Sequence, residues 1–389
     1  MKKIILVIFV LIILPSSSRS WNHSELQWYS FETEHFTIHY TDGFEDMAVE
    51  AARVAEDIYG PVTSFYGYAP KDKVHLIIKG NEDFAGGETY YYLNKIEITT
   101  TFLDFIYRGT SNWLWNVITH EFIHIISSHK SMKLPIEIPS LYFQVISFET
   151  EKRPDVLTGY PNFQVSFPFP GEVLPNWFAE GLSQFQCSTA RYDIWDTHRD
   201  MLLRMAALDG KLLSLSEMGV FGKKSIGNEL VYNQGFSLVR YIAQKYGKDK
   251  LNLLIEKMSS PFRLNFSGAC SSVLGISDRQ LYREWEESLK AHYNSVRNRI
   301  GDKRVEGEII FSKAFASVYP VALRESNRIF FLSNIDRDYL SFSLYSLDSE
   351  GKLKKLSSDV VSRPSISPDG NFICYIRATR KNKFGYRLN

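Results

Sequence analysis

The sequence predicts an α+β protein that continues into an all-β segment, and two observations support this fold class. Strand-like and helical runs are mixed over residues 28–128, and mainly helical runs follow as far as residue 301. This order, with strands first and helices later, favours an α+β domain over a βαβ sheet. From about residue 305 onward, short β-like runs are separated by turn residues. We therefore expect one domain at residues 21–301 and an incomplete all-β domain at residues 305–389.

The composition describes a folded chain and disfavours a nucleic-acid partner. Of 389 residues, 44% are hydrophobic and 23% are charged, so the chain can bury large cores and wholesale disorder is not expected. The net charge is +1 and the sequence has no basic stripe interleaved with aromatic residues, so nucleic-acid binding is not expected. The sparse cysteines, Cys187, Cys270 and Cys374, disfavour both a disulfide framework and a thiolate zinc site.

The N-terminus differs in character from the rest of the chain. Lys2 and Lys3 precede an unbroken apolar run at residues 4–14, which is followed by a serine-rich stretch that ends at Ser20. This order is typical of a cleavable secretory signal peptide, and the apolar run is too short to span a bilayer comfortably. We expect residues 1–20 to be a signal peptide, the mature protein to be exported to the periplasm or outside the cell, and no stable membrane span to remain. An uncleaved membrane anchor is the alternative.

Alternating and helical patterns predict the first elements. From Trp28 the chain alternates as a strand does, with Phe36, Ile38 and Tyr40 on one face. Apolar residues at helical spacing follow this strand. The expected elements are, in order, a strand at residues 28–40, a helix capped by Thr41 or Asp42 and stopped by Gly67, strands at 72–80 and 94–102, and a helix at 113–128.

Prolines punctuate the stretch between Lys130 and Leu174, which shows no clear periodicity. A loop of this length in a compact domain is usually functional or covers a ligand, so we expect an irregular segment here. Helical patterns resume after it. The expected later helices lie at residues 175–186, 196–210, 228–247, 248–260 and 278–300.

The segment NVITHEFIHIIS, which begins at Asn116, holds two histidines four residues apart. On a helix, His120 and His124 lie on one face with Cβ atoms about 6 Å apart, so both imidazoles can reach one ion. Glu121 lies about 100° further round the helix, which makes it a poor ligand but a suitable base beside the ion. Zinc lowers the pKa of a bound water, and a carboxylate can then remove the proton. One helical turn therefore offers two ligands and a general base.

A pair of core histidines without a metal is the alternative interpretation of this helix. Apolar residues surround the motif nearly all round the helix, so we expect the helix to be buried. Buried His and Glu side chains need partners, and a metal ion satisfies them well. This consideration favours the metal site.

A third ligand should lie further along the chain. The metzincin pattern H-E-x-x-H-x-x-G-x-x-H is rejected, because Ser127 takes its glycine position and Lys130 its third histidine position. The predicted helix in LPNWFAEGLSQF offers Glu180, and Gly181 beside it permits close approach of another helix. The apolar stripe expected to bury this helix consists of Trp177, Phe178, Leu182 and Phe185. The competing ligands are Glu149, Glu151, Glu172 and His198.

Together, H-E-x-x-H and the later P-x-W-x-x-E-G resemble the motifs of the peptidase MA-like gluzincins of secreted bacterial proteins, to which thermolysin is distantly related. The resemblance extends over residues 31–293. It implies a gluzincin-like zinc metallopeptidase domain, in which an N-terminal mixed sheet and active-site helix precede a mainly helical subdomain. It also implies that His120, His124 and Glu180 bind Zn2+ and that Glu121 is the general base.

Two features depart from the thermolysin pattern. About 55 residues separate His124 from Glu180, far more than in thermolysin. Gln184 stands where thermolysin-like enzymes hold an aspartate that orients a ligating histidine. Since such a histidine needs a partner for its second ring nitrogen, the Gln184 carbonyl could serve this purpose less strongly.

Two further features could bind or stabilise a substrate. The electrophile for a tetrahedral oxyanion is usually a Tyr or His on a later helix, and the candidates are Tyr232, which we prefer, and His198. A role in packing is the alternative for both. The strand at residues 95–101 could be the sheet edge that pairs with an extended substrate.

The C-terminal segment resembles part of a β-propeller. RPSISPDGNFICYI contains the S-P-D-G motif of TolB-like, WD40-related blades, with a tight turn at residues 368–370 between two strands. The preceding residues 318–358 fit another blade more loosely. A propeller closes from about four to eight blades, whereas residues 305–389 hold material for about two, so we expect the full propeller to continue beyond Asn389.

These interpretations predict an exported zinc metallopeptidase that hydrolyses peptide bonds with a zinc-activated water and Glu121 as general base. Its partners would be a peptide or protein substrate and, through the propeller, another protein. The alternative is a catalytically weak or inactive protein of the same fold that serves with its propeller as a binding scaffold. The intact ligand set and base favour the enzyme.

Overall fold

A computed structural model of the chain describes residues 26–388 apart from internal gaps. The gaps are residues 81–84, 102–107, 110–111, 135–140, 149–160, 170–173, 191–194, 222–225, 264, 302–304, 306, 324–326, 336, 338–340 and 383–384. The predicted signal peptide lies outside the described residues. Within the described ranges, no helix is both long and apolar enough to cross a membrane. The expected mixture of sheet and helix is confirmed.

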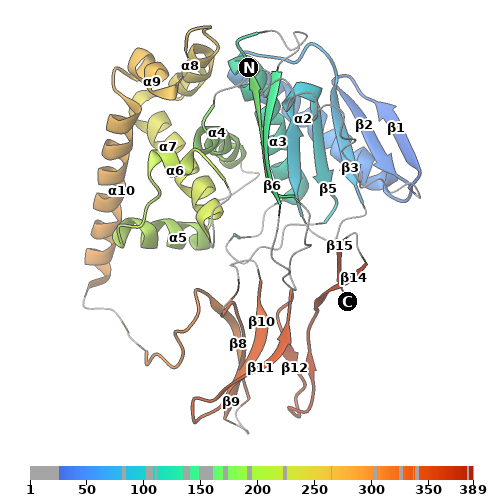
Figure 1. Cartoon of the computed structure of the whole chain (residues 1–389), viewed down its shortest axis with the longest axis vertical. Helices are drawn as coiled ribbons and strands as arrows, with labels where there is room; N and C mark the ends of the chain where they lie inside the picture. The colour runs from blue at the N-terminus through green and yellow to red at the C-terminus, as the bar shows by residue number, and fades with distance from the viewer. Residues whose placement is uncertain are drawn as a thin grey trace, which may run out of the picture.

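The N-terminal sheet is five-stranded and mixed, in the order β1-β2-β3-β5-β4 (Figure 1). Its strands are β1 (Trp28–Glu32), β2 (Phe36–Thr41), β3 (Val74–Lys79), β4 (Gly87–Tyr90) and β5 (Lys95–Thr99). The inner pairs β2–β3 and β3–β5 are parallel, whereas β1 and β4 pair antiparallel at the two edges. The predicted strand at residues 28–40 is therefore two strands, which a turn at residues 33–35 separates.

The predicted strand at residues 95–101 is not at an edge of this sheet, whose edge strands are β1 and β4. That strand, β5, is internal because it pairs with β3 on one side and with β4 on the other. Alternation with a period of two is the same in edge and internal strands, so the sequence pattern could not distinguish them. The short β4 begins at the second of two glycines, and its few residues carried no periodic pattern.

Helices α2 (Glu45–Tyr66) and α3 (Trp113–Ser131) pack against the sheet and against each other (Figure 1). α2 begins later than predicted and has Phe44 at its N-cap instead of Thr41 or Asp42, because Thr41 still belongs to β2 and the chain first turns through Gly43. The predicted stop at Gly67 is confirmed, since this residue has a left-handed φ of 58° that favours glycine.

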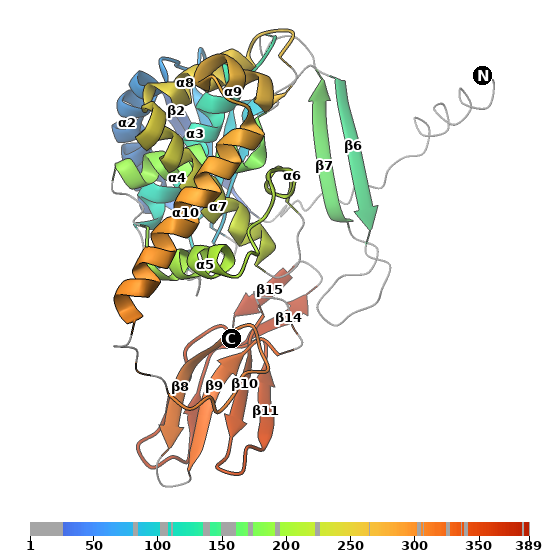
Figure 2. The ribbon, with the colours of Figure 1, turned by 90° about the vertical axis from the view of Figure 1, so that its left-hand side faces the viewer.

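The predicted loop between Lys130 and Leu174 contains a β-hairpin. In it β6 (Leu141–Phe148) pairs antiparallel with β7 (Pro161–Phe169), and Figure 2 shows this ribbon standing apart from the helices. Each strand of a two-stranded ribbon is an edge strand, where proline is tolerated. The prediction of an irregular segment was therefore wrong for these strands.

The later helices agree with the predicted ones and add two short helices. The predicted helices are α4 (Asn176–Thr189), α5 (Thr197–Leu208), α7 (Gly227–Tyr246), α8 (Asp249–Met258) and α10 (Asp278–Ile300). The two additions are α6 (Leu215–Met218) and α9 (Phe266–Leu274). The α9 sequence FSGACSSVL is rich in glycine and serine, which are weak helix formers, and its helical pattern is correspondingly poor.

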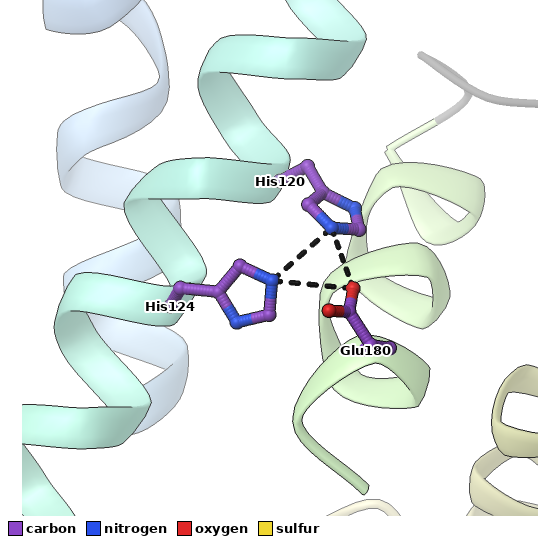
Figure 3. Close-up of side chains that lie close together, drawn as sticks. All are labelled: His120, His124 and Glu180. Atoms are coloured by element: carbon purple, nitrogen blue, oxygen red, sulfur yellow. Dashed lines mark hydrogen bonds and ion pairs between the residues drawn. The ribbon is translucent and has the colours of Figure 1, made fainter. Parts of the chain in front are cut away.

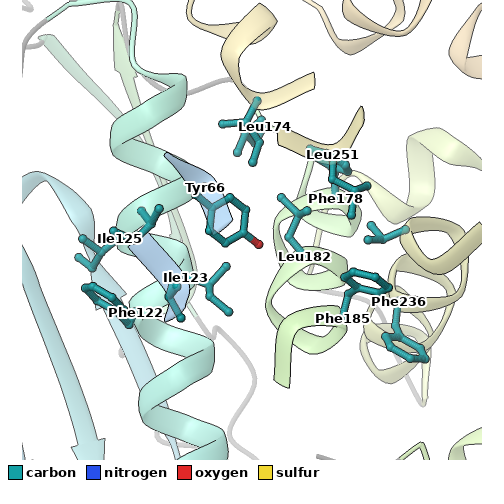
Figure 4. Close-up of a cluster of buried hydrophobic side chains, with 14 of the residues drawn as sticks. Tyr66, Phe122, Ile123, Ile125, Leu174, Phe178, Leu182, Phe185, Phe236 and Leu251 are labelled. Atoms are coloured by element: carbon teal, nitrogen blue, oxygen red, sulfur yellow. The ribbon is translucent and has the colours of Figure 1, made fainter. Parts of the chain in front are cut away.

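Helices α4 and α7 cross in direct backbone contact. A Cβ atom at Gly181 would lie 2.5 Å from the Gly235 carbonyl oxygen, and one at Gly235 would lie 2.3 Å from the Trp177 carbonyl oxygen. The predicted role of Gly181 in close helix approach is thus confirmed. The apolar stripe of α4 is buried as predicted, in a core shared with α3 and α7 (Figure 4).

The C-terminal part is all-β but forms no closed propeller within its described residues. Four strands, β8 (Ser317–Leu323), β9 (Arg328–Ser333), β10 (Ser343–Leu347) and β11 (Leu353–Ser358), make an antiparallel meander in the order β11-β10-β9-β8. Two further pairs follow, β12 (Ser365–Ile366) with β13 (Ile373–Cys374) and β14 (Ala378–Asn382) with β15 (Gly385–Leu388). Leu202 of α5 packs against buried residues of the meander, including Leu332 and Leu344.

Candidate metal centre

Three donor atoms from α3 and α4 lie together in the structure (Figure 3). His120 Nε2 lies 3.0 Å from Glu180 Oε2, and His124 Nε2 lies 3.1 Å from His120 Nε2 and 3.3 Å from Glu180 Oε2. The side chains are 13–16% exposed. Elsewhere in the described part of the chain, no three His, Cys, Asp or Glu side chains lie close enough to hold a metal ion.

The spacing and chemistry of these atoms fit one metal ion. Ligand atoms about 2.0–2.1 Å from a tetrahedral zinc ion lie about 3.3–3.4 Å from one another, close to the distances between these three atoms. A hydrogen-bonded triangle would need protons on the histidine nitrogens, whereas one cation satisfies all three donors. Two imidazoles and one carboxylate leave the fourth tetrahedral position open, which is the pattern of a catalytic site and not of a closed structural site.

Helix packing brings the three residues together. His120 and His124 are four residues apart on α3 and therefore lie one above the other on the same face. α4 packs against α3 and, on another side, is in backbone contact with α7, which the glycines Gly181 and Gly235 permit. Glu180 directly precedes the first of these glycines, so the point of closest helix packing lies beside the carboxylate.

The surroundings of Glu180 favour its ionised form. Burial by itself would raise the pKa of this carboxyl. The charge of His124, together with hydrogen bonds from His120 and His124, outweighs burial and holds the pKa of Glu180 well below its usual range. Glu180 is therefore a carboxylate, the form that binds a cation.

Glu121 is close to the histidines in sequence but faces a different neighbour. Its side chain is 6% exposed, and its Oε2 accepts a 2.7 Å hydrogen bond from the Thr89 hydroxyl of β4. The three ligand candidates do not include it. α3 thus directs its two histidines toward α4 and its buried carboxylate toward the sheet edge.

Of the two predicted oxyanion residues, Tyr232 of α7 is under the electrostatic influence of Glu180. The nearby charge of Glu180 and burial raise the pKa of Tyr232 well above its usual value, although Arg108 opposes this effect. The phenol therefore stays protonated and can donate a hydrogen bond. His198 lies elsewhere, in the first turn of α5, where its side chain is 56% exposed and lies beside Asp196.

Three of the competing ligands lie outside the described residues, whereas the predicted partner of a ligating histidine, Gln184, is described. Glu149, Glu151 and Glu172 lie outside the described residues. Gln184 is 4% exposed, and its Oε1 has no hydrogen-bond partner in the part of the chain that the structure describes. The Gln184 carbonyl therefore accepts no hydrogen bond from a ligating histidine in the described residues.

Arg108, which lies beside Tyr232, is not among the residues predicted from the sequence. Its Nε and Nη2 donate to the two carboxylate oxygens of Glu229, both at 2.9 Å, and Glu229 is 4% exposed. The guanidinium carbon lies 5.0 Å from the centre of the Tyr232 ring. The next residue, Gly109, donates its backbone N–H to Asp196 at 2.8 Å. No local motif marks these partners, because they are far apart in the sequence.

Comparison with known proteins found a distant structural similarity. No family model matches the chain, and no curated protein matches it. The chain is similar in structure to an aminopeptidase N family protein from Idiomarina loihiensis, with a TM-score of 0.41 and 11% sequence identity. The match covers 86% of this chain and 66% of that one, so the chain spans about two thirds of the length of that protein.

Proposed function

We propose that this protein is an exported zinc-dependent peptidase of the gluzincin type. In this proposal His120, His124 and Glu180 bind Zn2+, and Glu121 is the general base. The observation that carries it is the meeting of three donor atoms 3.0–3.3 Å apart, with a buried carboxylate next to the first histidine in sequence. Two histidines, one carboxylate and one open position are typical of catalytic zinc sites.

The residues around the cluster support distinct roles in peptide hydrolysis. A bound zinc ion supplies Lewis acidity, which lowers the pKa of water and polarises the substrate carbonyl. Glu121 takes a proton from the attacking water and returns it to the leaving amine. The protonated hydroxyl of Tyr232 donates a hydrogen bond to the oxygen that becomes negative in the transition state. An extended peptide pairs with the edge strand β4, which packs against α3.

The proposal includes export and a second domain with a binding role. The positive and apolar N-terminal residues support export through a cleaved signal peptide. The β8–β11 meander has the four antiparallel strands of one propeller blade, which supports a propeller-like region that binds a protein partner. The alternative is a scaffold without activity, and variants of Glu121 distinguish it from the enzyme.

Metal analysis of purified protein tests the ligand set. We expect about one zinc ion per chain, because the cluster offers one set of three ligands. His120→Ala and His124→Ala should lose it, while the control His292→Ala, an exposed histidine on α10, should keep it. The metal site is rejected if the parent protein, refolded with excess zinc, binds none.

A second set of variants distinguishes a base from a ligand. Glu121→Gln should keep zinc but hydrolyse an internally quenched peptide library at least about 100-fold more slowly, because only proton transfer is removed. Glu287→Gln, at an exposed position on α10, is the matched control and should behave as the parent. If Glu121→Gln and the parent hydrolyse the library equally well, a binding scaffold is the better description of this protein.

A further inference from the structure

The edge strand β4 touches Glu121 through a side-chain hydroxyl. Thr89 Oγ1 lies 2.7 Å from Glu121 Oε2 and 2.9 Å from the Glu121 backbone carbonyl oxygen. The threonine has a single hydroxyl hydrogen, and a charged carboxylate is the stronger acceptor of the two. Glu121 is 6% exposed and Thr89 is partly buried, so water has limited access to this bond.

The same strand, β4, also lies against Oε1, the second carboxylate oxygen of Glu121. A Cβ atom at Gly87 would lie 2.7 Å from Glu121 Oε1, 3.0 Å from Glu121 Cγ and 2.5 Å from a methyl carbon of Val117. No side chain therefore fits at position 87 while β4 stays this close to α3. Gly87 and Thr89 together enclose the carboxylate from the side of the sheet.

This part of the strand is held firmly on both sides. Thr89 is paired with Ile96 in the antiparallel ladder between β4 and β5. Before the strand, the Gly86 N–H donates to the Thr99 hydroxyl at 2.7 Å. After it, the Tyr91 carbonyl lies 2.6 Å from His129 Nε2 at the end of α3. The Thr89 hydroxyl thus has a fixed position from which to act on a flexible glutamate side chain.

We propose that Thr89 is a positioning residue that holds Glu121 in the orientation of a general base. The inference rests on the proposed function and assigns a role to this threonine within it. A glutamate side chain has several rotatable bonds, so an unheld Glu121 would sample positions in which it cannot accept a proton from water beside the ligands. The hydrogen bond from Thr89 keeps the carboxylate at the sheet edge and out of the ligand cluster. Thr89 itself does not touch the reacting atoms.

The bond can be tested without any hydrolysis. Thermal unfolding of the zinc-free parent, Thr89→Val, Glu121→Ala and the double variant forms a double-mutant cycle. We expect a non-additive result, with Thr89→Val lowering the melting temperature in the parent but having little effect in Glu121→Ala. Thr89→Ser keeps the hydroxyl and should restore most of the loss. Additive effects of the two substitutions would overturn the inference.

Binding of acetohydroxamic acid gives a second measure that is independent of turnover. A hydroxamate chelates zinc and donates a hydrogen bond to a correctly placed carboxylate beside the ion. Calorimetry on zinc-loaded proteins should show weaker binding to Thr89→Val than to the parent, and parent-like binding to Thr89→Ser. Equal affinity for all three proteins would overturn the inference.

Hydrolysis of the quenched peptide library separates this inference from the proposed function. Thr89→Val should reduce kcat about 10- to 100-fold, the usual effect of losing a group that orients a catalytic side chain, while KM and zinc content stay near parent values. Thr89→Ser should recover most of the activity. If Thr89→Val is fully active while Glu121→Gln is inactive, the inference fails and the proposed function stands. If Glu121→Gln is fully active, both fail.

Discussion

The five-stranded and the four-stranded sheets of this protein are supported by cores of very different extent. The inward-facing residues of the N-terminal sheet belong to a single large cluster that continues through α2, α3, α4 and α7. The β8–β11 sheet has two small clusters, one centred on Leu332 and Leu344 and the other on Phe331 and Tyr345. Several large apolar side chains near it are exposed, among them Ile309 at 80% and Phe372 at 73%.

This difference in core size explains which part of the protein can hold polar side chains in fixed positions. The ligand candidates and Glu121 lie on helices whose other faces are locked into the large core, so their side chains keep fixed positions at low exposure. Among the described residues, the β8–β11 sheet has no comparable helix packing apart from its contact with α5, through Met201 and Leu202. The contrast explains why the candidate site lies in the N-terminal part, beside the large core.

The largest effect that we expect comes from the helix crossing behind the site. Gly235→Ala would place a methyl group 2.3 Å from the Trp177 carbonyl oxygen, so α7 must move away from α4 and Glu180 moves with it. We expect a loss of at least about 3 kcal/mol in unfolding free energy, together with weaker zinc binding.

A matched glycine makes this test specific. Gly60 lies in the middle of α2 and is exposed, and a methyl group added there would have no described neighbour within 4 Å. Gly60→Ala should therefore change the unfolding free energy by less than about 1 kcal/mol, because the better helix propensity of alanine is opposed by the ring of Pro61, which disfavours a Cβ on the preceding helical residue. Urea denaturation would contradict the proposed crossing if Gly235→Ala cost no more than Gly60→Ala.

The next effect concerns the ion pair beside Tyr232. Arg108→Met leaves the buried Glu229 carboxylate without its bidentate partner, and we expect a loss of about 3 kcal/mol. Removing both charges in Arg108→Met/Glu229→Met should recover part of that loss. Lys290→Met, which breaks an exposed helical pair with Glu286, should cost no more than about 0.5 kcal/mol. Equal losses at the two pairs, measured by urea denaturation, would show that Arg108 is no more important than a surface residue.

A smaller effect tests whether the second sheet is independent of the site. Leu344 is fully buried in a small cluster, so Leu344→Ala should destabilise the C-terminal part by about 2 kcal/mol, at the low end for such substitutions. Limited proteolysis should then cleave near residues 302–306 faster than in the parent and leave residues 21–300 resistant. Zinc content should be unchanged. Loss of zinc in this variant would show that the two parts are coupled through α5.

The smallest effect is a pH dependence at the end of α3. Burial lowers the pKa of His129 below its usual 6.5, although a hydrogen bond with the Tyr91 carbonyl opposes the shift. Above pH 6.5 the imidazole is neutral in both folded and unfolded chains, so no penalty arises. As the pH falls below 6.5 the unfolded chain takes up the proton first, and stability decreases by up to about 1.4 kcal/mol per pH unit. His129→Asn should reduce this slope in denaturation curves measured from about pH 5.5 to about pH 7.5, a range that spans about one unit on either side of 6.5.

The sequence was sufficient for features that depend on neighbours along the chain. Helical periodicity predicted α3 and placed His120 and His124 on one face, and the positions of Gly67 and Gly181 were interpreted correctly. Prediction from local patterns failed where one pattern is compatible with two different structures. Prolines between Lys130 and Leu174 fit a loop as well as an edge ribbon, and alternation fits an internal strand as well as an edge.

Only the tertiary structure decided which distant groups meet. Glu180 was one of several candidate ligands until the packing of α4 on α7 placed it beside His120 and His124. Thr89 and Arg108 carry no sequence signal at all, because a hydrogen bond between β4 and α3, or between a loop and α7, depends on how whole elements pack. Periodicity records which face of an element is buried, but it contains no information on which other element covers that face.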